Sequence, residues 1–219
     1  MPLAPERFIT PEQLDHAPED VARASLYDLV RINRYLGGRR VLRSLFEGLV
    51  KPQEQFSVLD VGAGSGDLAA ALRGLYPGAK VTLLDHRLLH LVSAPSPKVV
   101  ADAFRLPFGP ASFDFVFSSL FLHHFSNEEV VDLLGNFRAV ARRAVLAIDL
   151  DRGPLAYHFL PATRWLFRWH DITISDGQIS VQAAFKREEL LALAVRAGLG
   201  WARVKSHRPW SRLSLSAPF

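Results

Sequence analysis

Short apolar runs alternate with amphipathic segments from about residue 55 to the end of the chain. The apolar runs predict buried strands at 56–61, 80–84, 98–101, 113–118 and 144–150. Helical spacing predicts the helices between and after them, at 67–75, 127–142 and 186–197. Because strands and helices alternate, we expect an α/β fold: a mostly parallel sheet with helices on both faces, closed by an antiparallel pair at 202–206 and 211–216.

Two regions fall outside this alternation. Residues 21–49 have the spacing of one or two amphipathic helices interrupted at Gly37–Gly38, and 155–184 form an insertion whose first half is rich in aromatic side chains. We therefore expect an N-terminal helical cap or lid over 1–50, and a sheet domain over 51–219 with a cap insertion at about 151–185. Both caps are expected over the carboxyl ends of the strands, or else on apolar sheet surface or at a dimer interface. The residues expected to line an acceptor pocket there are Tyr35, Trp165 and His170.

The most informative segment is a glycine-rich turn after the first strand. Asp60 precedes Gly62, Gly64 and Gly66, and Asp67 opens the next helix. Such a turn lets the backbone approach a nucleotide-type ligand closely and is expected to direct free N–H groups into the crevice. A dinucleotide-binding turn would carry another glycine where Asp67 stands. A carboxylate there repels pyrophosphate but tolerates a positively charged sulfonium ligand.

Acidic residues at two further strand ends extend this pattern. Asp85 ends the second strand, where a carboxylate can accept hydrogen bonds from both ribose hydroxyls. Asp102 and Ala103 follow the third strand and are succeeded by Leu106-Pro107-Phe108. The Asp102 side chain can accept from an adenine N6, and the next backbone N–H can donate to N1. The strand ends therefore predict a site for an adenosine-containing ligand.

With a fourth motif around strand four, Ser112-Phe113-Asp114-Phe115-Val116-Phe117-Ser118-Ser119-Leu120, residues 56–150 resemble a known family. It is the class I S-adenosylmethionine-dependent methyltransferases of ubiquinone and menaquinone C-methylation and of many natural-product O-methylations. The resemblance implies a Rossmann-like methyltransferase sheet and S-adenosylmethionine as cofactor. It also implies the cofactor contacts: Asp60, Gly62, Ala63 and Gly64 with the methionine moiety, Asp85 and His86 with the ribose, Asp102 and Ala103 with the adenine, and Ser118 beside the sulfonium.

One segment departs from the family pattern. Most such enzymes carry a Pro-Gly-Gly turn before the fifth strand, whereas this chain has Ala141-Arg142-Arg143-Ala144. A narrower group is similar here. It opens with the segment that in this chain reads Arg31-Ile32-Asn33-Arg34-Tyr35-Leu36-Gly37-Gly38, and it ends strand five in Asp149-Leu150. Similarity to that group implies an acceptor from a polyketide-type aromatic pathway.

Two adjacent histidines, His123 and His124, follow the fourth strand at the rim where acceptor and cofactor would meet. A phenol nucleophile, with a reference pKa of about 10, benefits from a nearby base; His124 is the first candidate and His123 the second. The alternative is that one histidine caps the loop and the other packs. No metal site is expected, because adjacent histidines lack the i, i+4 spacing of two ligands on one helical face, and no carboxylate cluster or cysteine stands nearby in the sequence.

The composition fits an enzyme of a reducing compartment. The 219 residues are 49% hydrophobic and 22% charged, and the absence of cysteine excludes disulfide frameworks and Cys-based metal sites. Residues 1–20 contain five acidic side chains and no apolar h-region, so no secretory signal is predicted. No apolar stretch reaches the ~20 residues of a membrane span. A cytoplasmic location is therefore expected.

An uneven charge distribution raises the main alternative function. Residues 138–219 hold 13 Lys and Arg against 6 Asp and Glu, which suits a nucleic-acid partner as well as a solvated basic face. However, enzymes that methylate exocyclic amino groups usually carry Asn/Asp-Pro-Pro-aromatic after strand four, where this chain has Ser118-Ser119-Leu120-Phe121. The sequence therefore predicts O- or C-methylation of a small, aromatic or polyketide-like acceptor. RNA or other nucleic-acid methylation and a non-catalytic cofactor-binding scaffold are the alternatives, and a homodimer is left open.

Overall fold

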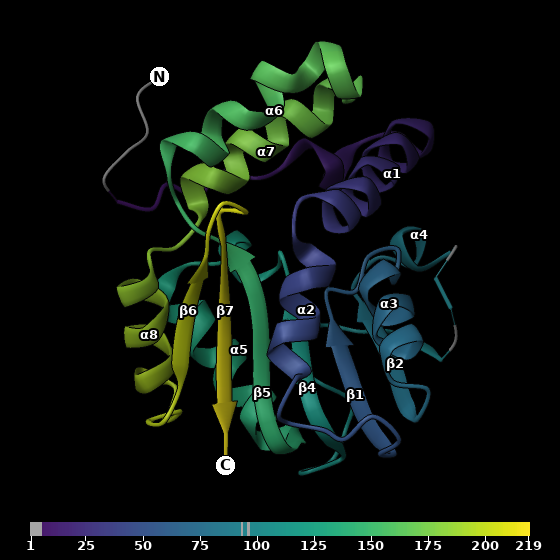
Figure 1. Ribbon diagram of the computed structural model, residues 1–219, viewed down its shortest axis with the longest axis vertical. Coiled ribbons are helices and arrows are strands. Elements are labelled where there is room, and N and C mark those ends of the chain that lie inside the picture. Colours follow the sequence, from purple (N-terminus) through teal and green to yellow (C-terminus); the bar gives the residue numbers. More distant parts are fainter. Residues whose placement is uncertain (1–5, 93, 96) are drawn as a thin grey trace.

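The computed structural model describes residues 6–92, 94–95 and 97–219, and its centre is a seven-stranded sheet of order β3-β2-β1-β4-β5-β7-β6 (Figure 1). The strands are β1 (Phe56–Val61), β2 (Ala79–Asp85), β3 (Lys98–Val100), β4 (Phe113–Ser119), β5 (Ala141–Leu150), β6 (Arg203–His207) and β7 (Arg212–Pro218). Neighbouring strands pair in parallel except at β7, which is antiparallel to both β5 and β6. The predicted α/β fold, mostly parallel with an antiparallel closing strand, is confirmed.

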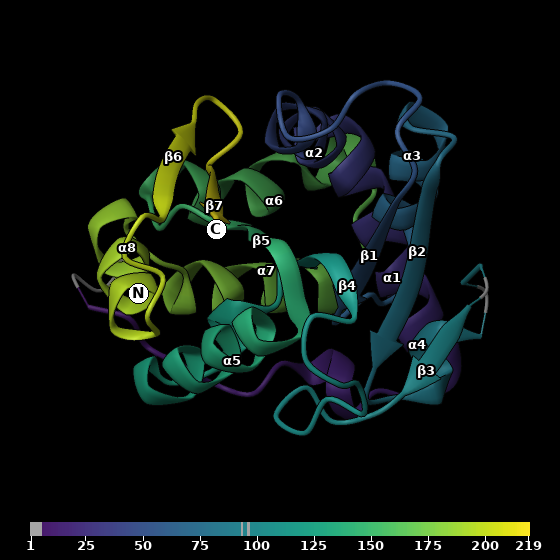
Figure 2. The ribbon, with the colours of Figure 1, turned by 90° about the horizontal axis from the view of Figure 1, so that it is seen from below.

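Helices cover both faces of the sheet. They are α2 (Gly38–Phe46), α3 (Asp67–Leu75), α4 (Leu88–Leu91), α5 (Asn127–Val140) and α8 (Arg187–Arg196). Figure 2 shows α5 and α8 on one face and α2 and α3 on the other. Each face has its own apolar core, around Leu134 and Leu190 on the first and around Leu42 and Leu72 on the second. The layered packing is the one that a parallel sheet, buried on both faces, requires.

A cap lies over the carboxyl ends of the parallel strands (Figure 1). It consists of η1 (Gln13–His16), α1 (Glu19–Tyr35), α6 (Pro154–Phe167) and α7 (Asp171–Ala183). Asp28 of α1, which is 3% exposed, accepts a hydrogen bond from the His170 backbone N–H at 2.8 Å, and Arg31 donates to the Phe167 carbonyl at 2.8 Å. The first helix and the insertion are therefore joined by partly buried polar contacts. No helix in the described part of the chain is long and apolar enough to cross a membrane.

Three differences from the sequence-based predictions have clear physical causes. The helix predicted over 127–142 ends at Val140, because Arg142 already belongs to β5 and its guanidinium reaches Asp114 of β4 at 3.1 Å. The insertion forms two full helices, α6 and α7, which were not predicted. Of the expected N-terminal cap, η1 and α1 lie over the strand ends, whereas α2 packs on the sheet with Phe46 fully buried.

A first prediction concerns this α2 contact. The Phe46 ring lies 5.5 Å from that of Phe115 and 6.0 Å from that of Phe56, measured between centroids. Phe46→Ala should lower the free energy of unfolding by about 3–5 kcal/mol, because it leaves a cavity in the core. Urea unfolding measures the change, and Val195→Ala, at a side chain 50% exposed on α8, is the control with little effect. A loss below about 1 kcal/mol for Phe46→Ala would contradict the packing.

Candidate active site

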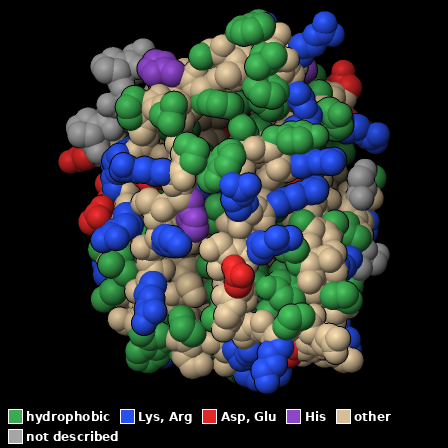
Figure 3. All heavy atoms as spheres, in the orientation of Figure 1, with side chains coloured by type: hydrophobic (Ala, Val, Ile, Leu, Met, Phe, Trp, Pro, Cys, Tyr) green, Lys and Arg blue, Asp and Glu red, His purple; other side chains and the backbone are tan. Residues whose placement is uncertain are grey.

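A large cavity opens between the strand ends and the cap. Its volume is about 930 Å³, at the upper end of the range for ligand pockets. One wall carries the strand ends, with Gly62, Asp85 and Asp102, and the opposite wall carries apolar side chains of the cap, such as Leu29 and Phe159. On the face seen in Figure 3, hydrophobic side chains surround an opening below the cap. The cavity is therefore bipartite, polar against the sheet and apolar against the helices.

The glycine-rich turn forms the floor of this cavity. Gly62, Gly64 and Gly66 have φ values of 70°, 52° and 70°, which favour glycine. At Gly62 a Cβ would also lie 2.3 Å from the Phe121 ring. The expectation of free N–H groups is wrong for this turn: the Gly62 and Ala63 N–H groups donate to the Leu84 carbonyl, and the Gly64 N–H donates to Asp85. The backbone is thus held in place by β2 rather than left open for a ligand.

Asp85, at the end of β2, lies in a set of donors beside the glycine turn. Its carboxylate accepts from the Gly64 N–H at 3.1 Å and the Arg87 N–H at 3.0 Å, and it contacts His90 Nδ1 at 3.2 Å. Burial alone would raise the pKa of Asp85, but the hydrogen bonds from His90 and the two backbone N–H groups hold it below its ordinary value. Asp85 is therefore an ionised acceptor that faces the cavity.

Three other predicted cofactor residues lie along the same wall, whereas Asp60, Ala63 and Ser118 are not among the residues that line the cavity. His86 lines the cavity with its Nδ1 3.4 Å from Asp85 Oδ1. Asp102 and Ala103 also line the cavity, and Asp102 accepts a hydrogen bond from the Phe104 N–H at 2.9 Å. Ser118, 1% exposed at the end of β4, pairs in register with Val61 of β1. The sheet thus brings the residues from three strand ends to one edge.

Three further polar residues, which the sequence analysis did not assign as ligands, connect the cap to this wall. Asn33 of α1 donates to Asp67 at 3.1 Å and accepts from Arg212 of β7 at 3.3 Å. Burial raises the pKa of Asp67 and lowers that of Arg212 to about 10. Among the described residues, Asp67 Oδ2, Ser118 Oγ, Arg212 Nη1 and His90 Nε2 are buried without a hydrogen-bond partner. Buried polar atoms are rarely unsatisfied, so the two of these that belong to cavity-lining residues, Arg212 Nη1 and His90 Nε2, mark where a polar ligand fits.

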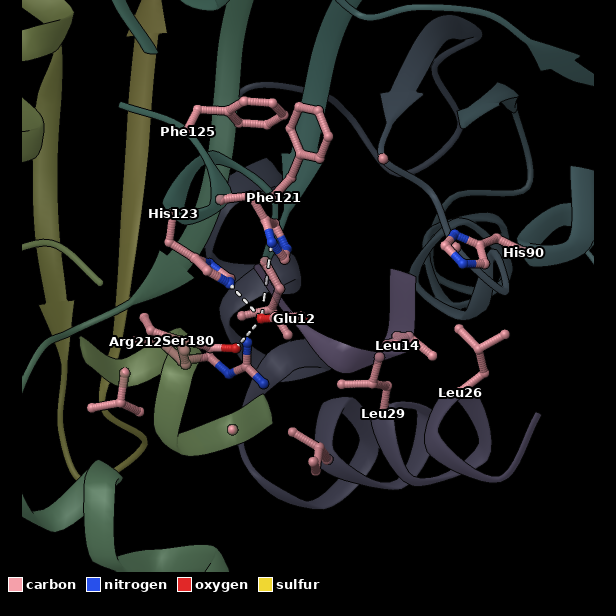
Figure 4. Close-up of a pocket in the computed structure, with 18 of the residues that line it drawn as sticks. Glu12, Leu14, Leu26, Leu29, His90, Phe121, His123, Phe125, Ser180 and Arg212 are labelled. Atoms are coloured by element: carbon pink, nitrogen blue, oxygen red, sulfur yellow. Dashed lines mark hydrogen bonds and ion pairs between the residues drawn. The ribbon is translucent and has the colours of Figure 1, made fainter. Parts of the chain in front are cut away.

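A carboxylate and two imidazoles also line the cavity, where the cap meets the end of β4. Figure 4 shows Glu12 pointing toward His123 and Ser180. Glu12 Oε1 lies 3.6 Å from His123 Nε2 and 3.9 Å from His124 Nδ1, while His123 Nδ1 contacts Asp149 Oδ1 at 2.6 Å. Burial opposes protonation of His123, but Asp149 and then Glu12 outweigh it and raise its pKa to about 9. His123 is therefore protonated at neutral pH, and of the two predicted bases only His124, a partly exposed side chain, remains.

An N-terminal strap, residues 7–16, delivers Glu12 to this position. Arg7 donates to the carbonyls of Ala183 at 2.7 Å and Phe125 at 2.9 Å, and Asp176 accepts from the Gln13 and Leu14 N–H groups, both at 2.9 Å. The sequence analysis missed Glu12 because nothing local distinguishes it. The alternation of Pro and acidic residues in this segment carries no periodic signal, so only the fold shows its role. A carboxylate does stand beside the histidines, against the reasoning that excluded a metal site.

The three expected acceptor-pocket residues are not part of the cavity wall. Tyr35 is 57% exposed at the end of α1, and Trp165 is 79% exposed on α6. His170 caps α7 by accepting from the Ile172 N–H, and it is not among the residues that line the cavity. The error lies in choosing by residue type: the face of an amphipathic cap helix that meets the cavity is apolar and mostly aliphatic, and these three side chains lie outside it. The lining comes from Leu26, Leu29, Ile32, Leu155, Phe159 and Leu160 instead.

Comparisons with known proteins agree with this geometry. Residues 59–152 match a family described as a methyltransferase domain. The ubiquinone/menaquinone biosynthesis C-methyltransferase UbiE of Paracoccus denitrificans (strain Pd 1222) is 27% identical over 171 residues, which cover 71% of this chain and 66% of that protein. A malonyl-[acyl-carrier protein] O-methyltransferase of Laribacter hongkongensis (strain HLHK9) is 34% identical over 113 residues, 44% of this chain and 37% of that protein. The chain thus spans from about two thirds to little more than a third of these relatives' lengths.

Solved structures support the fold over most of the chain. The plantazolicin methyltransferase BpumL in complex with SAH has a TM-score of 0.69 at 12% identity, covering 94% of this chain and 92% of that one. Human N-acetylserotonin methyltransferase in complex with SAM has a TM-score of 0.64 at 20% identity, covering 90% of this chain and 56% of that one. At such identities the likeness concerns the fold. It includes the cap as well as the sheet, because so little of the chain is left uncovered.

A second prediction follows from the buried carboxyl of Asp60 at the end of β1. Burial, together with the nearby carboxylates of Asp67 and Asp85, raises its pKa well above the ordinary 3.8. A raised folded-state pKa gives stability that is complete below the unfolded value and is lost as the pH rises through the folded value. Asp60→Asn should therefore raise the Tm of the ligand-free chain at pH 8, by about 2–4 °C for each kcal/mol of stability regained, and have little effect near pH 4.

Thermal scans at both pH values measure this, with Asp132→Asn as an exposed control on α5. A lower Tm for Asp60→Asn at pH 8 than for the parent chain would mean that the native protein stabilises the ionised carboxylate, against the assignment.

Proposed function

We propose that this chain, which belongs to the class I S-adenosylmethionine-dependent methyltransferases, transfers a methyl group to a small apolar acceptor that carries an acidic hydroxyl or an activated carbon. The observation that carries the proposal is the bipartite cavity. Its apolar wall suits an aromatic or polyketide-like acceptor, and the Glu12, His123 and His124 side chains also line it. Its polar wall has six of the expected cofactor residues, Gly62, Gly64, Asp85, His86, Asp102 and Ala103. When bound, S-adenosylmethionine supplies an electrophilic methyl group on a sulfonium.

The polar wall fits this cofactor. Asp85 is an ionised, cavity-facing carboxylate and would accept from the ribose hydroxyls, with His86 beside it. Asp102 and Ala103 would hold the adenine. The unsatisfied Ser118 Oγ lies at the end of β4, toward the expected methionine end.

The methionine end is completed by the glycine turn and by charge. Gly62, Ala63 and Gly64 allow close approach of the ligand, and Asp60 and Asp67 provide acidic groups for a cation. The unsatisfied Arg212 Nη1 is positioned for a carboxylate. The zwitterionic amino-acid end of the cofactor therefore meets both signs of charge that it requires.

The acceptor side requires proximity and exclusion of water more than elaborate chemistry. Methyl transfer is an in-line displacement, so holding the nucleophile near the methyl group supplies much of the rate. The apolar side chains of α1 and α6 would bury the acceptor, and α1 would act as a lid that opens near Gly37. The Glu12, His123 and His124 cluster would promote loss of the acceptor's proton, with His124 the member able to accept it.

The basic residues in the last third of the chain have structural roles in the fold, which argues against a nucleic-acid partner. Arg152 and Arg212 are fully buried, and several of the others pair with carboxylates, such as Arg143 with Glu54 at 2.6 Å and Arg196 with Glu128 at 3.5 Å. On the face seen in Figure 3 the Lys and Arg side chains are scattered among other groups. A strong electrostatic footprint for a phosphate backbone would instead be a continuous patch or stripe.

A third prediction concerns cofactor binding. By calorimetry the chain should bind S-adenosylmethionine and S-adenosylhomocysteine but not NAD, because Asp67 stands where a pyrophosphate-binding glycine would be. Asp85→Ala should weaken S-adenosylhomocysteine binding by roughly 1–3 kcal/mol, the cost of losing hydrogen bonds to a charged acceptor. Asp132→Ala, on the exposed face of α5, is the matched control. Binding of NAD without S-adenosylhomocysteine would overturn the cofactor assignment.

A fourth prediction separates transfer from a scaffold role. With labelled cofactor and a panel of phenols, aromatic polyketides and RNA, turnover should occur only with small acceptors. His124→Ala should lower kcat about 10²–10⁴-fold with S-adenosylhomocysteine affinity unchanged, because the side chain acts on the acceptor. His158→Ala, an exposed histidine on α6, is the control. Unchanged turnover in His124→Ala would show that the histidine is not a base and that proximity alone accelerates the transfer. Methyl transfer to RNA and to no small molecule would overturn the proposed class of acceptor.

A further inference from the structure

Three potential metal ligands converge at the acceptor side of the cavity. Among the described residues, one ligand atom each from Glu12, His123 and His124 lie within 4.8 Å of one another. We propose that these three side chains bind a divalent transition-metal ion such as Zn²⁺. Binding of the ion requires neither the cofactor nor the acceptor. The role of the ion described below rests on the proposed function.

Two of the three separations suit metal–ligand bonds after a small contraction, and the third pair of ligand atoms, on His123 and His124, lies within 4.8 Å. Bonds of about 2.0–2.2 Å at tetrahedral angles place neighbouring ligand atoms roughly 3.4 Å apart. Glu12 Oε1 is 3.6 Å from His123 Nε2 and 3.9 Å from His124 Nδ1. Both distances exceed a hydrogen bond, and they come within a few tenths of an ångström of that spacing. A carboxylate with two imidazoles is also a donor set that borderline metal ions prefer.

His123 is prepared as a ligand by its surroundings. Its Nδ1 is held by Asp149 at 2.6 Å, and Asp149 accepts in turn from the Leu150 N–H at 2.8 Å. Such a carboxylate behind an imidazole fixes the ring and raises its basicity, as is common for metal-bound histidines. The opposite nitrogen, His123 Nε2, is buried, has no hydrogen-bond partner among the described residues, and faces Glu12.

The other two ligands are also oriented. Ser180 donates a short hydrogen bond to Glu12 Oε1, and the strap contacts of Arg7 and Asp176 hold the backbone on either side of Glu12. The His123 and His124 rings stack with centroids 4.3 Å apart and planes at 30°. All three residues line the cavity. Three protein ligands would leave at least one coordination position for a group within it, which is the pattern of a catalytic rather than a structural site.

The open position identifies the class of acceptor more closely. A phenolic or enolic oxygen that binds the ion would lose its proton more readily, because the metal acts as a Lewis acid. The proton leaves to solvent, and His123 gives up its Nε2 proton when the ion binds. With the ion bound, His124 would be a metal ligand rather than a base. The ion would then promote the loss of the acceptor's proton in its place. The preferred acceptor would then be an oxygen nucleophile, or a carbon activated by an adjacent hydroxyl.

Metal titration of the full, tag-free chain after chelator treatment tests the site. Calorimetry should show one Zn²⁺ per chain, and Co²⁺ should give a visible absorption band from histidine ligation. Glu12→Gln and His124→Ala should each weaken Zn²⁺ binding more than 10-fold, and Asp149→Asn about 10–100-fold. Glu128→Gln, at an exposed carboxylate on α5, is the matched control and should bind as the parent chain does.

S-adenosylhomocysteine binding by the same preparations separates the two proposals. Retained binding in Glu12→Gln would show that the variant is folded and that its loss of Zn²⁺ is specific. Absence of Zn²⁺ binding by a parent chain that binds S-adenosylhomocysteine would overturn the metal site and leave the proposed function standing. Equal Zn²⁺ affinity in the parent chain and both ligand variants would place the ion on other histidines and would also overturn it.

Discussion

The buried pair of His123 and Asp149 holds the histidine end of the cavity in place. The two residues are 2% and 1% exposed, and removing one partner of such a pair leaves an uncompensated charge at a cost of about 3–5 kcal/mol. Asp149 lies in β5, which pairs with β4 on one side and β7 on the other. Because His123 belongs to η2 (Leu122–His124), its contact with Asp149 fixes η2 against the centre of the sheet. Glu12 can approach the imidazoles only because this loop is already placed.

The cap has a different physical character from the sheet beneath it. Hydrogen bonds between half-buried groups join its parts, as where Arg7 meets the Ala183 carbonyl and Asp28 meets the His170 N–H. Segments at opposite ends of the chain are thereby brought together over the strand ends. Regions with few apolar contacts and many accessible hydrogen bonds open at lower free energy than a core, which suits a cover that must admit ligands to an enclosed cavity. The sheet thus fixes the positions of the residues at the strand ends, and the cap controls entry to the cavity.

The parts of the molecule that were predictable from sequence are those encoded locally. β1 and α3 match their predicted limits, 56–61 and 67–75, because an apolar run, a glycine turn and an amphipathic period each leave a local pattern. Ser126 forms a capping box with Glu129 at the start of α5, which is likewise a local pattern. Glu12 could not be found in this way, since its role depends on contacts with His123 more than a hundred residues away. The helices of the insertion were missed because aromatic density obscured their period, and Pro161 interrupts α6 without ending it.

Charge gives the two ends of the cavity different tasks. At the glycine turn, the carboxylates of Asp67 and Asp85 lie close enough to Asp60 to disfavour its ionisation. A cation relieves such a cluster, so on the proposed function the site attracts a positively charged sulfonium. Transfer of the methyl group turns the sulfonium into a neutral thioether, and that attraction disappears without any movement of the protein. The same acidic wall would thus favour cofactor capture before the reaction and product release after it, while the histidine end acts on the acceptor alone.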